Sequence, residues 1–333
     1  MDIRALPIPA IALGAALVHA AVPYPEGSPV PRSLTPEEAA QVAEHPIVAP
    51  RTRSTAPPTG PVRAPAEYEP MESIIIAWEG TTEWRDLLRI MGVGITTVGD
   101  ADLWVYTDTQ SEADSAYAQL VTSGADGARV HTIVLRTDTI WIRDYGPQYI
   151  YEGGVRAAVD HTYNRPRPYD NAVPADYAAR RGHLYYDAPL VHGGGNFQLA
   201  ADATGYATEL IANENPSLTE PEIVDTWQSY WGIDTTITDA LPASVDSTQH
   251  IDMWMQMATP DKVVISDWPA QAGTAQDNVC DDWATELAAR GFDVTRVPAQ
   301  TVSGTHYTYT NVLICNDLVL VPAYTNPTIL AAG

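Results

Sequence analysis

Three short stretches of the sequence carry side chains that could act together on a cationic group. Asp144 lies in TDTIWIRDYGPQYI, His250 and Asp252 lie in HIDMW, and Asn311 lies in YTN. Two carboxylates match the planar donor fork of a guanidinium group, and a nearby histidine can transfer protons. The alternative for the first stretch is a structural ion pair between Arg143 and Asp144 at a turn.

The histidine and the second carboxylate are two positions apart. In a strand, His250 and Asp252 share one face and point into the same space. The same spacing would also suit half of a metal site, but the sequence shows no third clustered ligand, so we expect no metal.

The polar residues recur with a regular spacing along an α/β pattern. Asp144, Asn196, Asp252 and Asn311 are separated by 52, 56 and 59 positions, and each is expected to open the first strand of a hairpin. Helix-like segments precede these hairpins, and such a period indicates radial repetition of a small β-plus-α unit. Strand starts in a closed ring meet at its axis, so we expect Asp144, His250, Asp252 and Asn311 to face one pocket.

A proline-rich stretch between the first two hairpins, DHTYNRPRPYDNAVP, contains Arg165 and Arg167. Prolines stiffen this loop, and alternate residues of an extended chain point the same way, so both guanidinium groups could reach one anion. The alternative is a solvated basic loop.

The glycines of His192-Gly-Gly-Gly-Asn196 suggest the oxyanion loop of an esterase. That interpretation requires a G-x-S-x-G nucleophile motif, which the chain lacks. We expect instead that the glycines let the backbone approach the pocket, with Asn196 as a hydrogen-bonding residue at the strand start.

Composition limits the classes of partner. The formal net charge is −24 at pH 7, so nucleic acid is excluded as a partner, while cationic substrates are favoured if the charge does more than confer solubility. Only Cys280 and Cys315 are present, too few for a zinc ribbon or a disulfide framework, and both are expected to be small core residues.

The chain divides into three parts. Residues 1–20 form an apolar run behind Arg4 and predict a signal peptide, and the alternative of a membrane anchor is disfavoured by Pro7 and Pro9 and by the short length. Residues 21–60 predict a Pro-rich linker or pro-segment without regular structure. Residues 61–333 are expected to form the folded domain. With no later apolar span, the protein is expected to be secreted or periplasmic.

From about Pro57 onward, the chain resembles the bacterial peptidylarginine deiminases and agmatine deiminases, which modify guanidino groups. The motifs occur in the family's order: PPTGPVRAPAEYEP, TDTIWIRDYGP, YNRPRP, GGGNF, HIDMW and YTN. The resemblance implies a five-bladed α/β propeller (pentein) of ββαβ repeats that needs no cofactor. It also implies roles for five side chains: Asp144 and Asp252 clamp the guanidinium, His250 is the general acid and base, Asn311 orders the site, and Trp141 walls the pocket.

The resemblance also suggests the reaction and the substrate. YNRPRP looks like the secreted peptidylarginine type, in which Arg165 and Arg167 would hold the carboxylate of a C-terminal arginine. The expected reaction converts this arginine to citrulline and ammonia through a cysteine thiouronium intermediate. Alternatives are agmatine deiminase, which gives N-carbamoylputrescine, then an amidinotransferase on the same scaffold, or a guanidino-binding homologue without catalysis.

The nucleophile departs from the family pattern. The family's cysteine follows the asparagine by about one further repeat, and that spacing from Asn311 passes Gly333. The last blade is therefore expected to be incomplete, with the catalytic domain truncated before the cysteine and the chain inactive by itself. Cys315 lies four strand residues beyond Asn311, about 13 Å away, and Cys280 lies on a predicted helix.

Overall fold

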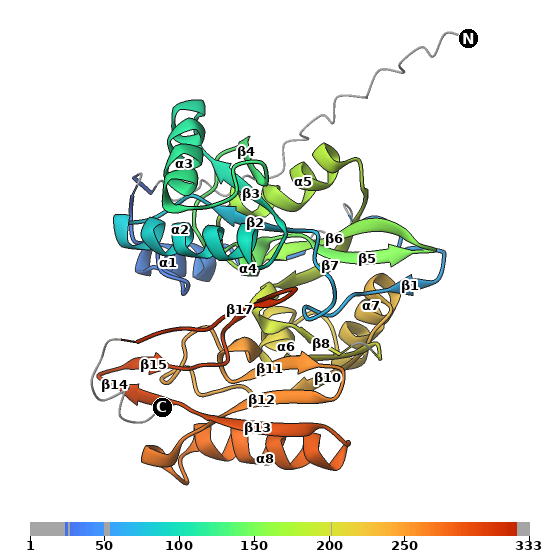
Figure 1. Cartoon of the computed structure of the whole chain (residues 1–333). Helices are drawn as coiled ribbons and strands as arrows, with labels where there is room; N and C mark the ends of the chain where they lie inside the picture. Colours follow the sequence, from blue (N-terminus) through green and yellow to red (C-terminus); the bar gives the residue numbers. More distant parts are fainter. Residues whose placement is uncertain (1–23, 26, 50–53, 201, 325–333) are drawn as a thin grey trace.

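The computed structural model describes residues 24–25, 27–49, 54–200 and 202–324 (Figure 1). The expected signal peptide at 1–20 lies outside these residues. No helix in the described ranges is both long and apolar enough to span a membrane.

The first α/β unit is entirely parallel. Its elements are β2 (Ser73–Ala77), α2 (Thr82–Thr97), β3 (Asp102–Thr107), α3 (Gln110–Ser123) and β4 (Val130–Val134). β3 pairs in parallel with both β2 and β4, so β2 lies at one edge of this sheet. Thr81 and Thr109 cap the two helices by accepting backbone N–H bonds, and α3 ends at Gly124, whose φ of 110° suits glycine.

Three further units repeat one pattern, in which an antiparallel hairpin is followed by helix and then by a strand parallel to the second hairpin strand. The first contains β5 (Gln148–Glu152), β6 (Val155–Tyr163), η1 (Asp170–Ala172), α5 (Val173–Arg181) and β7 (Leu184–His192). The second contains β8 (Gln198–Leu199), β9 (Thr204–Thr208), α6 (Leu210–Glu214), α7 (Glu220–Trp231) and β10 (Asp234–Thr238). The third contains β11 (Met255–Thr259), β12 (Lys262–Asp267), η4 (Pro269–Gln271), α8 (Ala275–Ala289) and β13 (Asp293–Pro298). The pairings confirm the predicted hairpins and their repetition.

Three of the four polar residues expected to open strands lie on single helical turns just before them, whereas Asn311 lies in irregular chain before the strand Leu313–Cys315. These turns are α4 (Ile142–Tyr145), η2 (Gly194–Asn196) and η3 (Ile251–Met253), and η2 contacts both of the others. His250 and Asp252 therefore do not share a strand face, as the sequence suggested. His250 is the extended residue before η3, with φ −72° and ψ 149°, and Asp252 lies within the turn.

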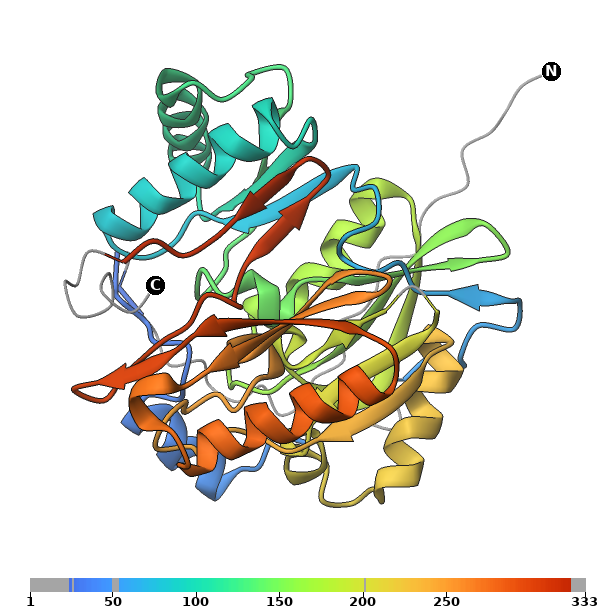
Figure 2. The ribbon, with the colours of Figure 1, turned by 60° about the horizontal axis from the view of Figure 1, so that its bottom comes forward.

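The C-terminal part of the described chain contains two small hairpins, β14 (Gln300–Val302) with β15 (Thr305–Tyr307) and β16 (Leu313–Cys315) with β17 (Leu318–Leu320). Figure 2 shows β16 and β17, in dark red, beside β2 and α2 of the first unit. The Asn316 amide fixes this contact by donating to the carbonyl oxygens of Met71 (2.9 Å) and Gly99 (2.6 Å). The last described hairpin thus packs on the first α/β unit.

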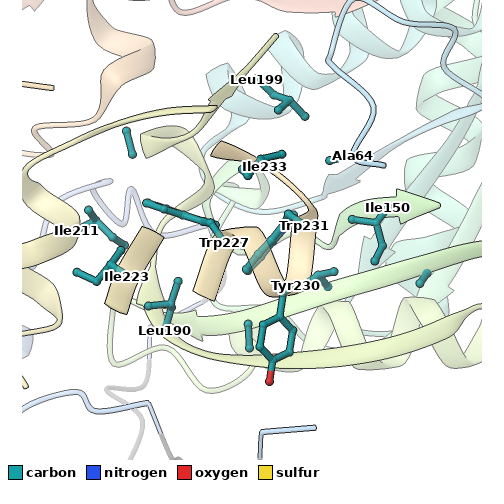
Figure 3. Close-up of a cluster of buried hydrophobic side chains, with 14 of the residues drawn as sticks. Ala64, Ile150, Leu190, Leu199, Ile211, Ile223, Trp227, Tyr230, Trp231 and Ile233 are labelled. Atoms are coloured by element: carbon teal, nitrogen blue, oxygen red, sulfur yellow. The ribbon is translucent and has the colours of Figure 1, made fainter. Parts of the chain in front are cut away.

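Buried apolar side chains hold the units together. In the cluster of Figure 3, Trp227 and Trp231 of α7 pack with Ile150 of β5 and Leu190 of β7. Trp227 is fully buried, so its truncation to alanine would cost about 3–5 kcal/mol. This cluster joins two successive units and fixes the strands that lead into the turns.

The segment expected to lack structure contains a helix, which corrects the interpretation of residues 21–60 as an unstructured linker. α1 spans Pro36–Glu44 and begins with a capping box between Thr35 and Glu38. Beyond this range, β1 (Val62–Arg63) pairs with β5. Residues 30–38 lie against later parts of the fold, as the contacts below show.

Candidate active site

The two carboxylates and the histidine predicted from sequence converge on Gly195. A Cβ atom added to this glycine would lie 2.6 Å from His250 Nδ1, 2.8 Å from Asp144 Oδ1 and 2.9 Å from Asp252 Oδ2. No L side chain fits there, so the glycine run allows the backbone to approach the three groups. Turns from three different units therefore meet at one point.

Asp144 is held by contacts on both its side chain and its backbone. Its Oδ1 accepts the Gly195 N–H at 3.2 Å and lies 3.4 Å from His250 Nδ1. Its carbonyl oxygen accepts a bond from His161 Nε2 at 3.1 Å. The carboxylate can therefore orient the His250 ring through Nδ1 and leave Nε2 for a reacting group.

Burial and charge shift the pKa values of the three groups in a coherent way. Burial alone would raise the pKa of Asp144, but the neighbouring His250 outweighs it and holds that pKa below its ordinary value. Burial would lower the pKa of His250, but Asp144 outweighs it and raises that pKa. Burial raises the pKa of Asp252 to about 7. This pattern describes an ion pair beside a carboxyl group whose burial is not offset by the nearby charges of His250 and Arg143.

Two polar atoms of this group are buried without a hydrogen-bond partner among the described residues. They are His250 Nε2 and Asp252 Oδ1. Unpaired buried polar atoms are costly, and in a native protein they call for an explanation such as a ligand. The site therefore offers one carboxylate oxygen and one imidazole nitrogen to a bound molecule.

Asn311 lies beside the group rather than in hydrogen-bond contact with its carboxylates. Its Nδ2 points to Met253 Sδ at 3.2 Å, and the preceding Thr310 donates its hydroxyl to the Asp252 carbonyl oxygen at 3.1 Å. The YTN stretch thus supports the backbone of the turn that carries Asp252.

A cavity of about 900 Å³ opens next to these turns. Its lining includes Trp141, Arg143, Gly194 and Asn311, but not the two carboxylates or His250. Trp141 packs edge-on against Trp84, with ring centroids 5.5 Å apart. The expected wall residue Trp141 therefore borders a large cavity that the three converging groups do not line.

The arginine pair is not arranged as the sequence suggested. Arg167 N–H donates to the Arg165 carbonyl oxygen at 2.8 Å, so this loop turns and does not extend with both side chains on one side. The Arg167 guanidinium is buried and bonded to Glu38, and it is not open to a substrate carboxylate in this structure. Arg165 Nε donates to Arg32 O, while its charge acts on Asp144 and His250.

Arg143 does not form the ion pair with Asp144 that the alternative interpretation required. Its guanidinium binds the Glu67 carboxylate through two bonds of 2.8 Å. It also donates to Val312 O at 3.2 Å, and Glu67 Oε1 accepts the Ile314 N–H at 3.0 Å. This pair joins α4 to the C-terminal hairpin and leaves Asp144 free for His250.

Sequence reasoning missed several residues around the site. Glu214 accepts a bond from Asn164 Nδ2 at 2.7 Å, and burial raises its pKa to about 7. His161 and His192 stack edge to face, and burial lowers the pKa of His161 to about 4, so it is neutral at pH 7. Asn164 and His192 stand in the quoted motifs, but Glu214 carries no local signal.

Neither cysteine reaches the convergence point. Cys280 accepts a bond from Trp268 Nε1 at 3.4 Å in one core cluster, and burial raises its pKa to about 12. Cys315 lies in another core cluster, and burial raises its pKa to about 11. Both thiols are therefore protonated at neutral pH and remote from the three groups.

Comparisons with known proteins show the family of this chain. Residues 63–330 match the family model described as Porphyromonas-type peptidyl-arginine deiminase, and the chain belongs to this family. Its similarity thus extends to a class of hydrolases that act on guanidino groups.

Curated relatives at low identity are named agmatine deiminases. A putative agmatine deiminase of Photobacterium profundum is 26% identical over 318 residues, covering 81% of this chain and 85% of the relative. The agmatine deiminase of Ectopseudomonas mendocina is 26% identical over 234 residues, covering 65% of this chain and 63% of the relative.

Solved structures share the mixed α/β fold. A C. jejuni agmatine deiminase, a Cys-to-Ser variant with substrate bound, superposes with a TM-score of 0.67 at 17% identity, covering 81% of this chain and 85% of that one. The Porphyromonas gingivalis structure described as a putative arginine deiminase gives 0.68 at 18% identity, with 82% and 88% covered. At these identities the likeness concerns the fold alone.

Proposed function

We propose that this chain binds a substrate guanidinium between Asp144 and Asp252 as the recognition step of a hydrolytic deimination. The observation that carries the proposal is the convergence of both carboxylates and His250 on Gly195, within 2.9 Å of one point. A guanidinium presents five N–H donors in a planar fork, which suits two carboxylates better than a point charge does. It would also supply the donor that Asp252 Oδ1 lacks.

The reaction would follow from this placement. A thiolate adds to the central guanidinium carbon, and ammonia leaves with a proton supplied by His250 Nε2. Water then gives one proton to the same nitrogen while its oxygen adds to the thiouronium carbon. The C–S bond breaks as the new hydroxyl group loses its proton to solvent, so the neutral ureido product leaves and the thiolate is restored. The burial of Cys280 and Cys315 argues against either thiol as this nucleophile and supports the proposal that the reacting thiol comes from outside the 333 residues.

The repeated units support a finer proposal about architecture. We propose that they are blades of the five-bladed α/β propeller expected from the resemblance. Support comes from the three repeated units and from the packing of β16 and β17 on the first unit. The turns that carry Asp144, Asn196 and Asp252 would then lie at the ring axis.

For the substrate, a small guanidino amine of the agmatine kind is the first candidate. The named relatives are agmatine deiminases, and Glu38 occupies Arg167, so this arginine does not offer a carboxylate site. A peptide with a C-terminal arginine is the second candidate, favoured by the position of Arg165 close to the charge of Asp144 and His250.

Isothermal titration of the purified chain with agmatine tests the proposal without requiring turnover. Asp144→Asn and Asp252→Asn should each weaken binding by about 2 kcal/mol or more, roughly 30-fold, because each removes a buried partner of the cation. Asp114→Asn is the matched control, since Asp114 is an exposed carboxylate on α3. Unchanged affinity in both site variants would refute the proposal.

A further inference from the structure

Residues 30–38, which we call the N-terminal strap, lie on the side chains expected to recognise substrate. Trp141 Nε1 donates to Val30 O at 2.9 Å. Arg165 Nε donates to Arg32 O at 3.1 Å. Backbone carbonyls of the strap therefore occupy donors from two different loops of the site.

The third of these side chains, Arg167, makes the most contacts with the strap, while its Nη1 atom is buried without a hydrogen-bond partner among the described residues. Arg167 Nε donates to Glu38 Oε1 at 2.8 Å, and Nη2 donates to Glu38 Oε2 at 3.1 Å. Nη2 also reaches Pro31 O at 2.8 Å and Ser33 O at 3.2 Å. Both charged side chains of the Arg167–Glu38 pair are fully buried. This two-point contact is the geometry that an arginine offers to any carboxylate.

A second ion pair fixes the strap beside the catalytic turn. Arg32 Nη2 lies 2.6 Å from Asp246 Oδ2, and Arg32 Nη1 lies 3.1 Å from Met253 Sδ. The same sulfur receives the Asn311 amide at 3.2 Å, and Met253 directly follows Asp252. The strap thus contacts the turn that carries one of the two proposed guanidinium ligands.

The loop that carries Arg165 and Arg167, which we call the arginine loop, connects the strap to the convergence point at Gly195. Asn164 N–H donates to His192 O at 3.1 Å, and the Asn164 side-chain nitrogen lies 2.8 Å from where a Cβ of Gly193 would be. This loop therefore contacts the glycine run 193–195 through Asn164. It contacts the strap through Arg165 and Arg167.

We propose that the strap is a built-in competitor of peptide substrates, in which the Glu38 carboxylate takes the place of the carboxylate of a C-terminal arginine. The inference rests on the proposed function and adds its regulation. With the strap in place the site accepts guanidino amines without a carboxylate. A peptide with a free C-terminal arginine binds only when its carboxylate displaces Glu38 from Arg167 and α1 loosens.

Replacing the Glu38 carboxylate with a substrate carboxylate leaves the buried charge of Arg167 paired. Arg167 cannot be left alone in the interior, because an unpaired buried charge is strongly destabilising. A substrate carboxylate would replace one anion with another and keep the guanidinium paired. An amide or an amine in the same place would leave the Arg167 guanidinium without an anion. Competition with Glu38 should therefore require a negatively charged group on the ligand.

Hydrogen exchange of the full chain tests the proposal with three ligands: a short peptide ending in arginine, the same peptide with an amidated C-terminus, and agmatine. We expect the free-carboxylate peptide to increase exchange at least tenfold in residues 36–44. The other two should leave α1 protected. Binding of the free-carboxylate peptide with α1 unchanged would overturn the proposal, as would equal loosening by all three ligands.

A variant provides a second, independent arm. Glu38→Gln should raise exchange in α1 without ligand and tighten binding of the free-carboxylate peptide at least tenfold relative to its amide. Glu37→Gln removes the same charge from the exposed side of the same helix and should change neither. Equal behaviour of the two variants would overturn the strap's role. Agmatine distinguishes failure of the strap proposal from failure of the guanidinium site. If agmatine binds while the strap predictions fail, the guanidinium site stands. If no ligand binds, both proposals fail.

Discussion

The Oδ1 atom of Asp144 lies 3.4 Å from Nδ1 of His250, and the two residues come from turns of different units. Each changes the other: His250 holds the pKa of Asp144 low, and Asp144 holds the pKa of His250 high. Asp252 lies beside them with its pKa raised to about 7 by burial. The site therefore carries protons at neutral pH that a cation would displace.

Agmatine binding should release protons below pH 7. A guanidinium stabilises ionised Asp252, so affinity should rise with pH up to about 7, by as much as tenfold per unit, and then level off. Titration calorimetry at pH 6 in two buffers of different ionisation enthalpy measures this release directly. Equal heats in both buffers would contradict the assignment of Asp252 to the ligand.

The same carboxyl group should affect stability in the absence of ligand. The pKa of Asp252 is raised in the folded chain, so its burial costs stability as pH rises from about 4, where the unfolded group ionises, to about 7. Asp252→Asn removes this titration. Its free energy of unfolding should therefore exceed that of the unchanged chain by more at pH 7.5 than at pH 5, as urea denaturation would show.

Gly195→Ala should abolish agmatine binding. The added methyl would stand within 2.9 Å of all three converging groups and must displace them. Gly94→Ala is a suitable control, because the nearest atom to its new methyl is a Leu318 side-chain carbon at 3.3 Å. Circular dichroism would show whether the fold survives, and retained affinity in Gly195→Ala would mean that the convergence point is not the ligand site.

The Arg143–Glu67 pair should hold the C-terminal hairpin in place. Glu67→Gln weakens both the ion pair and the bond to Ile314 N–H, a loss of about 1.5–3 kcal/mol for contacts to a charged group. Hydrogen exchange should rise in residues 313–320 and remain unchanged in β6 and β7. A uniform change across the chain would show that the pair stabilises the fold as a whole.

The sequence predicted the hairpins and the meeting of Asp144, His250 and Asp252 at one site. It did not predict the local backbone conformation of these residues. Alternating apolar residues mark β11, a short apolar run marks β12, and turn residues separate them, so the hairpin follows from pattern alone. Pattern does not show that a single turn precedes the hairpins that begin at β5, β8 and β11, since three or four residues carry no helical period. His250 and Asp252 were thus placed together correctly, but for a reason that the structure corrects.

In the N-terminal segment the sequence does contain a signal for a helix, but the high proline content led to the prediction of an unstructured linker. Thr35-Pro36-Glu37-Glu38 is a capping box with proline at the first helical position, and it begins α1. The partner of Glu38 could not be foreseen, since Arg167 is distant in sequence. The burial of Arg167 depends on this tertiary contact. The same contact explains why Arg167 does not face a substrate anion in this structure, contrary to what the sequence suggested.

The position of the guanidinium can be seen in a crystal structure of the chain grown with agmatine. We expect guanidinium nitrogens within about 3 Å of carboxylate oxygens of both Asp144 and Asp252, next to Gly195. Agmatine bound elsewhere, or a guanidinium that contacts neither carboxylate, would contradict this expectation.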